Sequence, residues 1–214
     1  QTSANSAFLI IRKGDFLMPF IYQITDDFPG NTGFQHFSDK QKNNVDMIYN
    51  RFHPSMTNEA LAGILGNMDA EGFLNPGQGE LQQNMSPQYG LGLIQWTPNA
   101  HIGDNPLQVY ATSVGGLWYD GNLQCDLILT GEPGAWITTS SYPYTWEEYC
   151  QLTDIEVATK AYFHERLRGT WLDTRLTYAR DWLQYIGDIP PTPPGDLWLY
   201  GGIRDVLRRL IIHC

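Results

Sequence analysis

The spacing of apolar residues predicts a first helix between Ser38 and Pro54. Ser38 and Gln41 are placed as in a capping box, in which the two side chains bond backbone amides at the start of a helix. Pro54 ends the helix, because the residue before a proline disfavours helical backbone. The residues that repeat with the helical period are Val45, Ile48, Tyr49 and Phe52.

A second helix is predicted from an N-cap at Thr57 to about Glu71, and Gly72 ends it. Gly63 and Gly66 lie inside this helix. Because a glycine costs about 1 kcal/mol in a helix interior, the two indicate close packing against another backbone. The apolar face consists of Ala60, Leu61, Ile64, Leu65 and Met68.

Residues 72–104 are rich in Gly, Asn, Gln and Pro and lack a helical period. They predict a loop and a small β-hairpin, with Leu91–Ile94 as its apolar strand. Further helices are expected from Pro106, over about 117–129, from a capping box at Thr153 and Glu156 to about Arg166, and from Asp173 onward. The last of these should bury Leu176, Ala179, Trp182, Leu183 and Ile186.

These elements predict a mainly α (α+β) fold in three parts. Residues 1–37 form an N-terminal arm, residues 38–189 form one helical domain with the hairpin, and residues 190–214 form a proline-rich linker and an amphipathic helix. The apolar stripe 203–211 of that helix fits docking onto a partner protein and equally fits folding back onto its own domain.

Composition narrows the possible partners. Thirteen Lys and Arg oppose 23 Asp and Glu, a net charge of −10, which argues against a nucleic-acid partner. The chain has no stretch of about 18 apolar residues, so no membrane span is predicted. An acidic protein also gains no electrostatic attraction to the anionic polymers of a bacterial wall, a difficulty that tethering to a larger assembly would remove.

Several kinds of site are not indicated by the sequence. The three cysteines Cys125, Cys150 and Cys214 are widely spaced, which favours buried thiols over a disulfide framework, although a Cys125–Cys150 bridge stays open. The five histidines form no HExxH pattern, so we expect neither a metal nor another cofactor. Glu165, Arg166 and Arg175 are interpreted as a structural ion-pair set.

Glu71 is the strongest candidate for acid chemistry. It shares a helical face with Ile64 and Met68, and the helix breaks directly after it. Its carboxyl group should therefore lie at the edge of the core, facing the glycine-rich segment. Cleavage of a glycosidic bond needs a proton on the leaving oxygen, and a partly buried carboxylic acid can supply it.

Three segments carry a resemblance to a known family. Residues 63–71 (GILGNMDAE), 74–76 (LNP) and 89–98 (YGLGLIQWTP) resemble the signature of phage tail lysozymes. They are more distantly similar to the Glu helix and the Gly-Leu-x-Gln strand of goose-type lysozymes and lytic transglycosylases. Residues scattered from Thr145 to Trp182 extend the similarity, so that it covers about 37–186.

The resemblance implies a lysozyme-like domain in which Glu71 is the general acid. Such a domain cuts the glycan strand of peptidoglycan between N-acetylmuramic acid and N-acetylglucosamine, and it sits at the tip of a phage tail beside other tail proteins. One residue departs from the wider superfamily, which has Ser where this chain has Gly72. The match fixes no second carboxylate, and Asp69, Glu80 and Asp104 are candidates by proximity in sequence only.

The resemblance also indicates substrate-binding residues. Gln95 and Trp96 would line the groove with Tyr89 nearby, and Asn75 is a further candidate. An exposed aromatic ring can stack on a sugar, and an amide can bond an acetamido group. Core packing for Trp96 and a satisfied strand amide for Gln95 are the alternatives.

Three functions follow from this reading. The first is a muramidase that hydrolyses the glycan, the second a lytic transglycosylase that cuts the same bond without water, and the third a non-catalytic structural protein of the tail tip. The first is favoured because the similarity to tail lysozymes is closer. In each case the expected location is the virion, acting at the bacterial wall.

Overall fold

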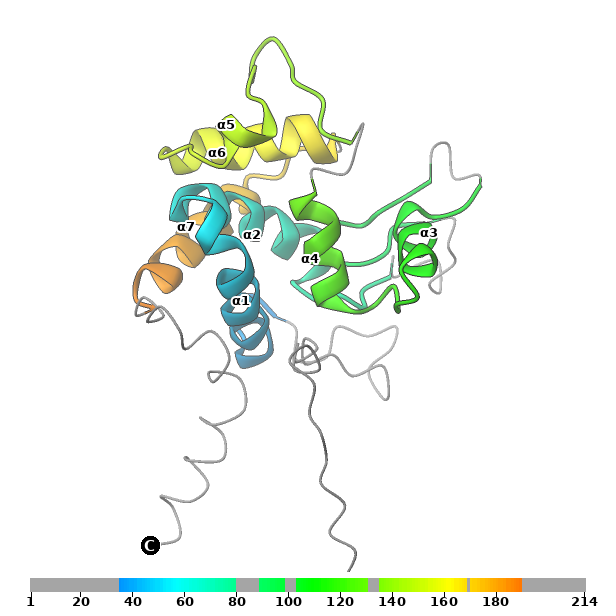
Figure 1. The fold of residues 1–214 in the computed structure, drawn as a ribbon. Helices are drawn as coiled ribbons and strands as arrows, with labels where there is room; N and C mark the ends of the chain where they lie inside the picture. Colours follow the sequence, from blue (N-terminus) through cyan, green and yellow to red (C-terminus); the bar gives the residue numbers. More distant parts are fainter. Residues whose placement is uncertain (1–34, 80–88, 99–102, 131–134, 169, 190–214) are drawn as a thin grey trace, which may run out of the picture. The chain divides into compact units, whose positions relative to one another are not determined.

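A computed structural model describes residues 35–79, 89–98, 103–130, 135–168 and 170–189. This part of the chain is mainly helical, in agreement with the predicted fold class (Figure 1). Most of the predicted N-terminal arm, the linker and the C-terminal helix lie outside the described residues. No helix of the described part is long and apolar enough to cross a membrane.

The second predicted helix, α2 (Asn58–Gly72), is the centre of the domain. It begins at the predicted N-cap Thr57, whose hydroxyl accepts a hydrogen bond from the amide of Ala60 at 3.1 Å. Figure 1 shows α1 (Asp39–Phe52), α6 (Ile155–Tyr162) and α7 (Thr174–Gly187) around it. The contacts are most extensive with α7 and then with α6. Because helices surround α2, all of its residues from Ala60 to Asp69 are buried.

The two glycines inside α2 mark these crossings. A Cβ on Gly63 would lie 2.9 Å from the carbonyl carbon of Ala158 in α6. A Cβ on Gly66 would lie 2.5 Å from the carbonyl oxygen of Arg175 and 2.6 Å from the amide nitrogen of Ala179, both in α7. The predicted close packing against other backbones is therefore confirmed, with a different helix at each glycine.

The start of α1 matches the prediction only in part. The hydroxyl of Ser38 accepts from the amide of Gln41 at 3.4 Å, as expected for the N-cap. The side chain of Gln41 does not complete a capping box. Its Nε2 donates instead to Oδ1 of Asp69 at 2.6 Å and to the carbonyl oxygen of Phe73 at 3.0 Å, and so joins α1 to the end of α2.

The later helices also begin at cap residues, not always the predicted ones. Helix α3 (Pro106–Ser113) starts where predicted, while α4 (Gly121–Leu129) starts four residues later than expected, after the cap Asp120. The predicted capping box at Thr153 and Glu156 is wrong, because the carboxylate of Asp154 caps α6. A capping box that the sequence analysis missed, Thr145 with Glu148, opens the short helix α5 (Trp146–Tyr149).

Helix α6 continues into a short π-helix, η3 (Phe163–Leu167), so helical backbone reaches about as far as predicted. A short 3₁₀ helix, η1 (His53–Ser55), follows α1 at the predicted stop. In α7, Ala179, Trp182 and Ile186 are buried as expected. Leu176 and Leu183 are only partly buried, and Arg175 takes a buried place on that face.

The predicted hairpin strand is not extended. Leu91 and Trp96 form an isolated antiparallel bridge, with N···O distances of 3.1 and 2.8 Å, and the four residues between them form a turn. Gly92 at φ +77° and Gln95 at φ +53° adopt left-handed backbone, which curls the segment. The apolar residues Leu91–Ile94 are buried, but as a turn and not as a strand.

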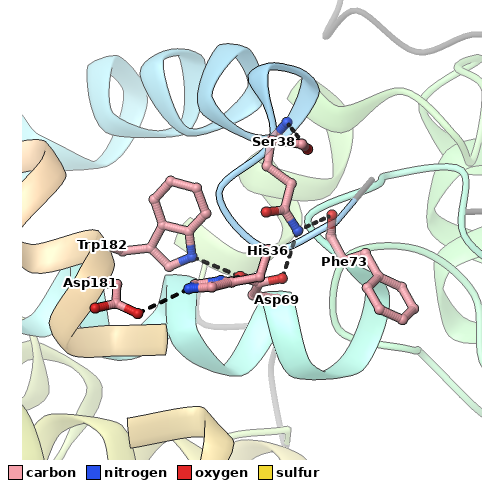
Figure 2. A network of polar contacts seen from close by, with 7 residues as sticks. His36, Ser38, Asp69, Phe73, Asp181 and Trp182 are labelled. Carbon is pink, nitrogen blue, oxygen red and sulfur yellow. Dashed lines mark hydrogen bonds and ion pairs between the residues drawn. The ribbon is translucent and has the colours of Figure 1, made fainter. Parts of the chain in front are cut away.

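A largely buried polar network around Asp69 fixes the end of α2 (Figure 2). Asp69 is 1% exposed, and its Oδ2 lies 2.6 Å from Nδ1 of His36 and accepts from Nε1 of Trp182 at 2.9 Å. The other ring nitrogen of His36 lies 3.0 Å from Oδ2 of Asp181. Burial raises the pKa of Asp69, and the hydrogen bonds from its neighbours oppose that rise. Together with Gln41, these residues join α1, α2 and α7.

Cys125 and Cys150 are free and buried, as the interpretation of buried thiols predicted, and Cys214 lies outside the described residues. Burial raises the pKa of Cys150 to about 11, and Cys125 is shifted in the same direction for the same reason. Neither thiol is therefore a reactive thiolate near neutral pH.

A second carboxyl group is buried in η3. Glu165 is fully buried, its Oε1 accepts from the amide of Thr139 at 3.4 Å, and its backbone carbonyl accepts from the amide of Ile137 at 3.1 Å. Its Oε2 has no hydrogen-bond partner within the described residues. Burial raises the pKa of Glu165 from 4.5 to about 7, so the folded protein favours the neutral acid.

We expect Glu165→Gln to stabilise the protein relative to wild type as the pH rises. The folded state retains the proton of Glu165 up to about pH 7, whereas the unfolded chain loses it near 4.5. Wild-type stability from this group is therefore greatest below 4.5 and falls as the pH rises to about 7. Thermal unfolding of both proteins across this range should show a difference that grows with pH. A difference that stays constant across this range would contradict the expectation.

Candidate active site

Glu71 lies in the last turn of α2, where the buried helix reaches the surface. Its side chain is 23% exposed, which agrees with the predicted position at the edge of the core. After Gly72 the chain reverses through Phe73 and Leu74, both in left-handed backbone at φ +53° and +54°. The amide of Asn75 then donates to the carbonyl oxygen of Gly72 at 2.8 Å and fixes the reversal.

Arg175 is the partner of Glu71. Its Nη2 donates to Oε1 of Glu71 at 2.6 Å, and the arginine side chain is only 3% exposed. The expectation that Arg175 belongs to a structural set with Glu165 and Arg166 is therefore wrong for this residue. Glu165 bonds a backbone amide in η3, and the guanidinium of Arg166 lies over the ring of Trp96, 5.9 Å from its centroid.

The turn between Leu91 and Trp96 lies directly against the helix end that carries Glu71. A Cβ on Gly72 would be 2.8 Å from the carbonyl oxygen of Gly92 and 3.5 Å from Nε2 of Gln95. This contact gives a physical reason for the departure from the superfamily pattern, because a serine at position 72 would push the turn away. The absence of a side chain at Gly72 brings the turn and the helix end together.

Gln95 is the candidate binding residue that the fold brings against Gly72, the residue directly after Glu71. It is partly exposed, and its Nε2 donates to the carbonyl oxygens of Gly92 at 2.9 Å and Gln78 at 3.4 Å. Its Oε1 faces Gly90, where a Cβ would lie 2.6 Å from it. The amide therefore shapes its own turn, while the partly exposed side chain stays at the surface next to Gly72.

Trp96 and Asn75, two of the predicted substrate-binding residues, are buried and stabilise turns. Trp96 is 3% exposed, so its ring presents no open face to a sugar, and its backbone closes the turn with Leu91. Asn75 is 4% exposed, and its Oδ1 accepts from the amide of Gly77 at 3.0 Å, which forms an Asx turn. Tyr89 is partly exposed at the start of the described turn segment, and its carbonyl oxygen accepts from Nδ2 of Asn105 at 3.1 Å.

No second carboxylate is brought beside Glu71 by the candidates that the structure describes. Asp69 lies two residues earlier on α2, about 200° around the helix, and points into the buried network with His36 and Trp182. Asp104 is exposed in a loop, and Glu80 lies outside the described residues. The described residues also contain no group of three or more His, Cys, Asp or Glu that could hold a metal ion.

The sequence contains a signal for the burial of Arg175. Arg175 precedes Ala179, Trp182 and Ile186 by four, seven and eleven positions, and so falls on the buried face of α7. A buried arginine needs an anionic or strongly polar partner. The only way to name that partner was to know that α7 crosses α2 near Gly66.

The described residues form a mainly helical domain in which a partly exposed glutamate ends a buried helix against a glycine-rich turn, an arrangement that is consistent with a lysozyme-like domain. Residues 40–186 match the model of the phage tail lysozyme family, which is more than half of the chain, and the chain belongs to that family. It is also similar to Morphogenesis protein 1 of Bacillus phage B103, with 39% identity over 56 residues. That match spans 26% of this chain and 15% of the relative.

Proposed function

We propose that this protein cleaves the glycan strand of peptidoglycan between N-acetylmuramic acid and N-acetylglucosamine, with Glu71 as the general acid. The observation that supports this most strongly is the position of Glu71 at the exposed end of a buried helix, directly before Gly72, which lies against the turn that carries Gln95. Membership of the phage tail lysozyme family supports a role in degrading the bacterial wall for a phage. The particular bond and mechanism are our proposal.

In the reaction, protonated Glu71 gives its proton to the glycosidic oxygen as the bond between that oxygen and the anomeric carbon breaks. The leaving sugar departs with a new hydroxyl group. Water then adds to the anomeric carbon, and the proton that water loses restores the acid. Gln95 is partly exposed, its amide lies against Gly72 next to the acid in sequence, and it is the proposed contact for an acetamido group of the glycan.

The proposed site of action is the host wall, with the protein carried on a phage tail. The net charge of −10 supports tethered delivery, because this protein gains no electrostatic attraction to anionic wall polymers. Tail proteins of the same virion are its proposed partners.

Mass spectrometry of the products of wall digestion tests the proposal. Purified peptidoglycan treated with the protein should release fragments that end in reducing N-acetylmuramic acid, because water attacks the anomeric carbon. Anhydro-muramic ends as the main product would assign a lytic transglycosylase instead. Intact glycan after prolonged digestion by the folded protein would favour the structural role at the tail tip.

A further inference from the structure

The ion pair between Glu71 and Arg175 is part of a larger set of contacts that joins three helices. Nη1 of Arg175 donates to Oδ1 of Asn67 at 3.3 Å, one turn before Glu71 on α2. Nδ2 of Asn67 in turn donates to the carbonyl oxygens of Thr159 in α6, at 3.0 Å, and Gly63, at 2.8 Å. The guanidinium is thus held in place by α2, α6 and α7 together.

The surroundings of Arg175 leave it little freedom to move. Its guanidinium lies 4.9 Å from the ring centroid of Phe163, and its backbone carbonyl lies at the tight crossing with Gly66. It is 3% exposed, whereas its partner Glu71 is 23% exposed. The arginine is therefore the fixed member of the pair, and the glutamate is the member that reaches solvent.

Stability alone is a weak reason for this arrangement. A buried charge loses its hydration, and replacing a buried ion pair with apolar residues is often neutral or stabilising. In this case the compensation is incomplete, because Nε of Arg175 is buried with no hydrogen-bond partner in the described part of the chain. The direct contact with the carboxyl group of the proposed acid gives the buried guanidinium a function.

Resting on the proposed function, we infer that Arg175 is a positioning residue for the reaction. It holds Oε1 of Glu71, so that Oε2 is the oxygen that carries the proton toward the glycosidic bond. Among the described residues, no other side chain forms a hydrogen bond or an ion pair with Glu71. Without the guanidinium, the glutamate side chain would sample several rotamers, and the productive one would be populated for a smaller part of the time.

A positioning role has a kinetic consequence that can be measured. Arg175 contacts Glu71 and is itself only 3% exposed, so its loss should lower kcat while KM stays nearly unchanged. A residue that only supports the fold would not produce this split between kcat and KM in a folded variant.

The test compares Arg175→Gln and Arg175→Lys with wild type in the full chain, with kcat and KM measured on purified peptidoglycan. For Arg175→Gln we expect kcat to fall by about 10²-fold with a nearly unchanged KM. For Arg175→Lys, which keeps the charge but lacks the planar guanidinium, we expect partial rescue, with a smaller loss of kcat. Arg180→Gln is the control, because Arg180 is exposed on the same helix and lies 3.6 Å from Glu156.

A folded Arg175→Gln protein with wild-type kcat would overturn the inference. If that variant does not fold, Arg175→Lys tests the inference instead. Wild-type turnover in Arg175→Lys would show that the planar guanidinium of Arg175 does not position Glu71. The double variant with Glu71→Gln should be no slower than Glu71→Gln alone, since both residues act through one carboxyl group. Inactive wild-type protein would remove the proposed function itself, whereas active wild type with unaffected Arg175 variants would remove only this inference.

Discussion

Replacing Glu71 with Gln is expected to lower the turnover of peptidoglycan by about 10²–10⁴-fold or more, which is the usual contribution of a positioned proton donor. The amide has nearly the same size and can still accept the hydrogen bond from Arg175, which in the wild type is 2.6 Å long. It has no acidic proton to transfer. The loss should therefore appear in kcat, measured by release of soluble fragments from purified walls.

The choice of control for this experiment follows from the structure. Asp69 is close in sequence, but it is 1% exposed and bonded to His36, Gln41 and Trp182, so a change there would disturb the fold. Glu59 is a better match, because it lies in the first turn of the same helix and is not buried. Glu59→Gln should leave turnover unchanged. A folded Glu71→Gln protein that digests walls at nearly the wild-type rate would remove the basis of the proposed mechanism.

Thermal unfolding must accompany the Glu71→Gln experiment, because the substitution removes the negative partner of a buried guanidinium. An uncompensated buried charge is destabilising, and the exposure of Glu71 should reduce that cost. A loss of turnover is informative only at temperatures where the variant is fully folded.

Local sequence signals were sufficient to predict much of the fold. The cap at Thr57, the stop after Glu71 and the two glycines inside α2 depend on neighbouring residues or on the absence of a side chain, and all three are seen in the structure. The N-cap of α6 was harder to predict, because Thr153 and Asp154 are adjacent and both residue types are good N-caps. The sequence alone therefore did not show that Asp154 is the cap.

The turn at 91–96 shows why the sequence predicted a strand where the structure has a turn. A short apolar run flanked by glycines fits a strand, and burial of Leu91 and Leu93 agrees with that reading. What bends the segment is left-handed backbone at Gln95, a non-glycine residue for which the sequence gives no warning. The contact of Gly72 with Gly92 depends on this bend, so it could not be foreseen either.

The hydrogen-bond partners of Glu71 and Asp69 could not be predicted from the sequence, for a related reason. Arg175 is 104 positions from Glu71, and Trp182 is 113 positions from Asp69. Both pairs depend on the crossing of α2 and α7. The sequence identified Glu71 as a carboxyl group at the edge of the core, whereas only the packing of the helices shows which side chains bond Glu71 and Asp69.

That crossing can be tested at Gly66, where we expect an alanine to cause a large loss of stability. Its Cβ would lie 2.5 Å from the carbonyl oxygen of Arg175 and 2.6 Å from the amide nitrogen of Ala179. Both are backbone atoms of one helix, so α7 as a whole would have to move away from α2.

Overpacking of this kind typically costs 1–3 kcal/mol, and we expect Gly66→Ala to lie at the upper end, at about 3 kcal/mol, because no flexible side chain can yield. For a domain of this size such a loss corresponds to a fall in Tm of roughly 6–12 °C. Gly63→Ala should cost less, because the closest atom there is 2.9 Å away.

Gly187→Ala is the matched control for this series. Gly187 ends α7, and a Cβ there would meet nothing within 4 Å. Alanine at this position should be neutral or slightly stabilising, because it restricts the unfolded chain and suits a helix. Equal Tm values for Gly66→Ala and Gly187→Ala would show that α2 and α7 do not cross as closely as described. Since the same crossing carries the backbone of Arg175, Gly66→Ala should also lower turnover at temperatures where it is folded, and Gly187→Ala should not.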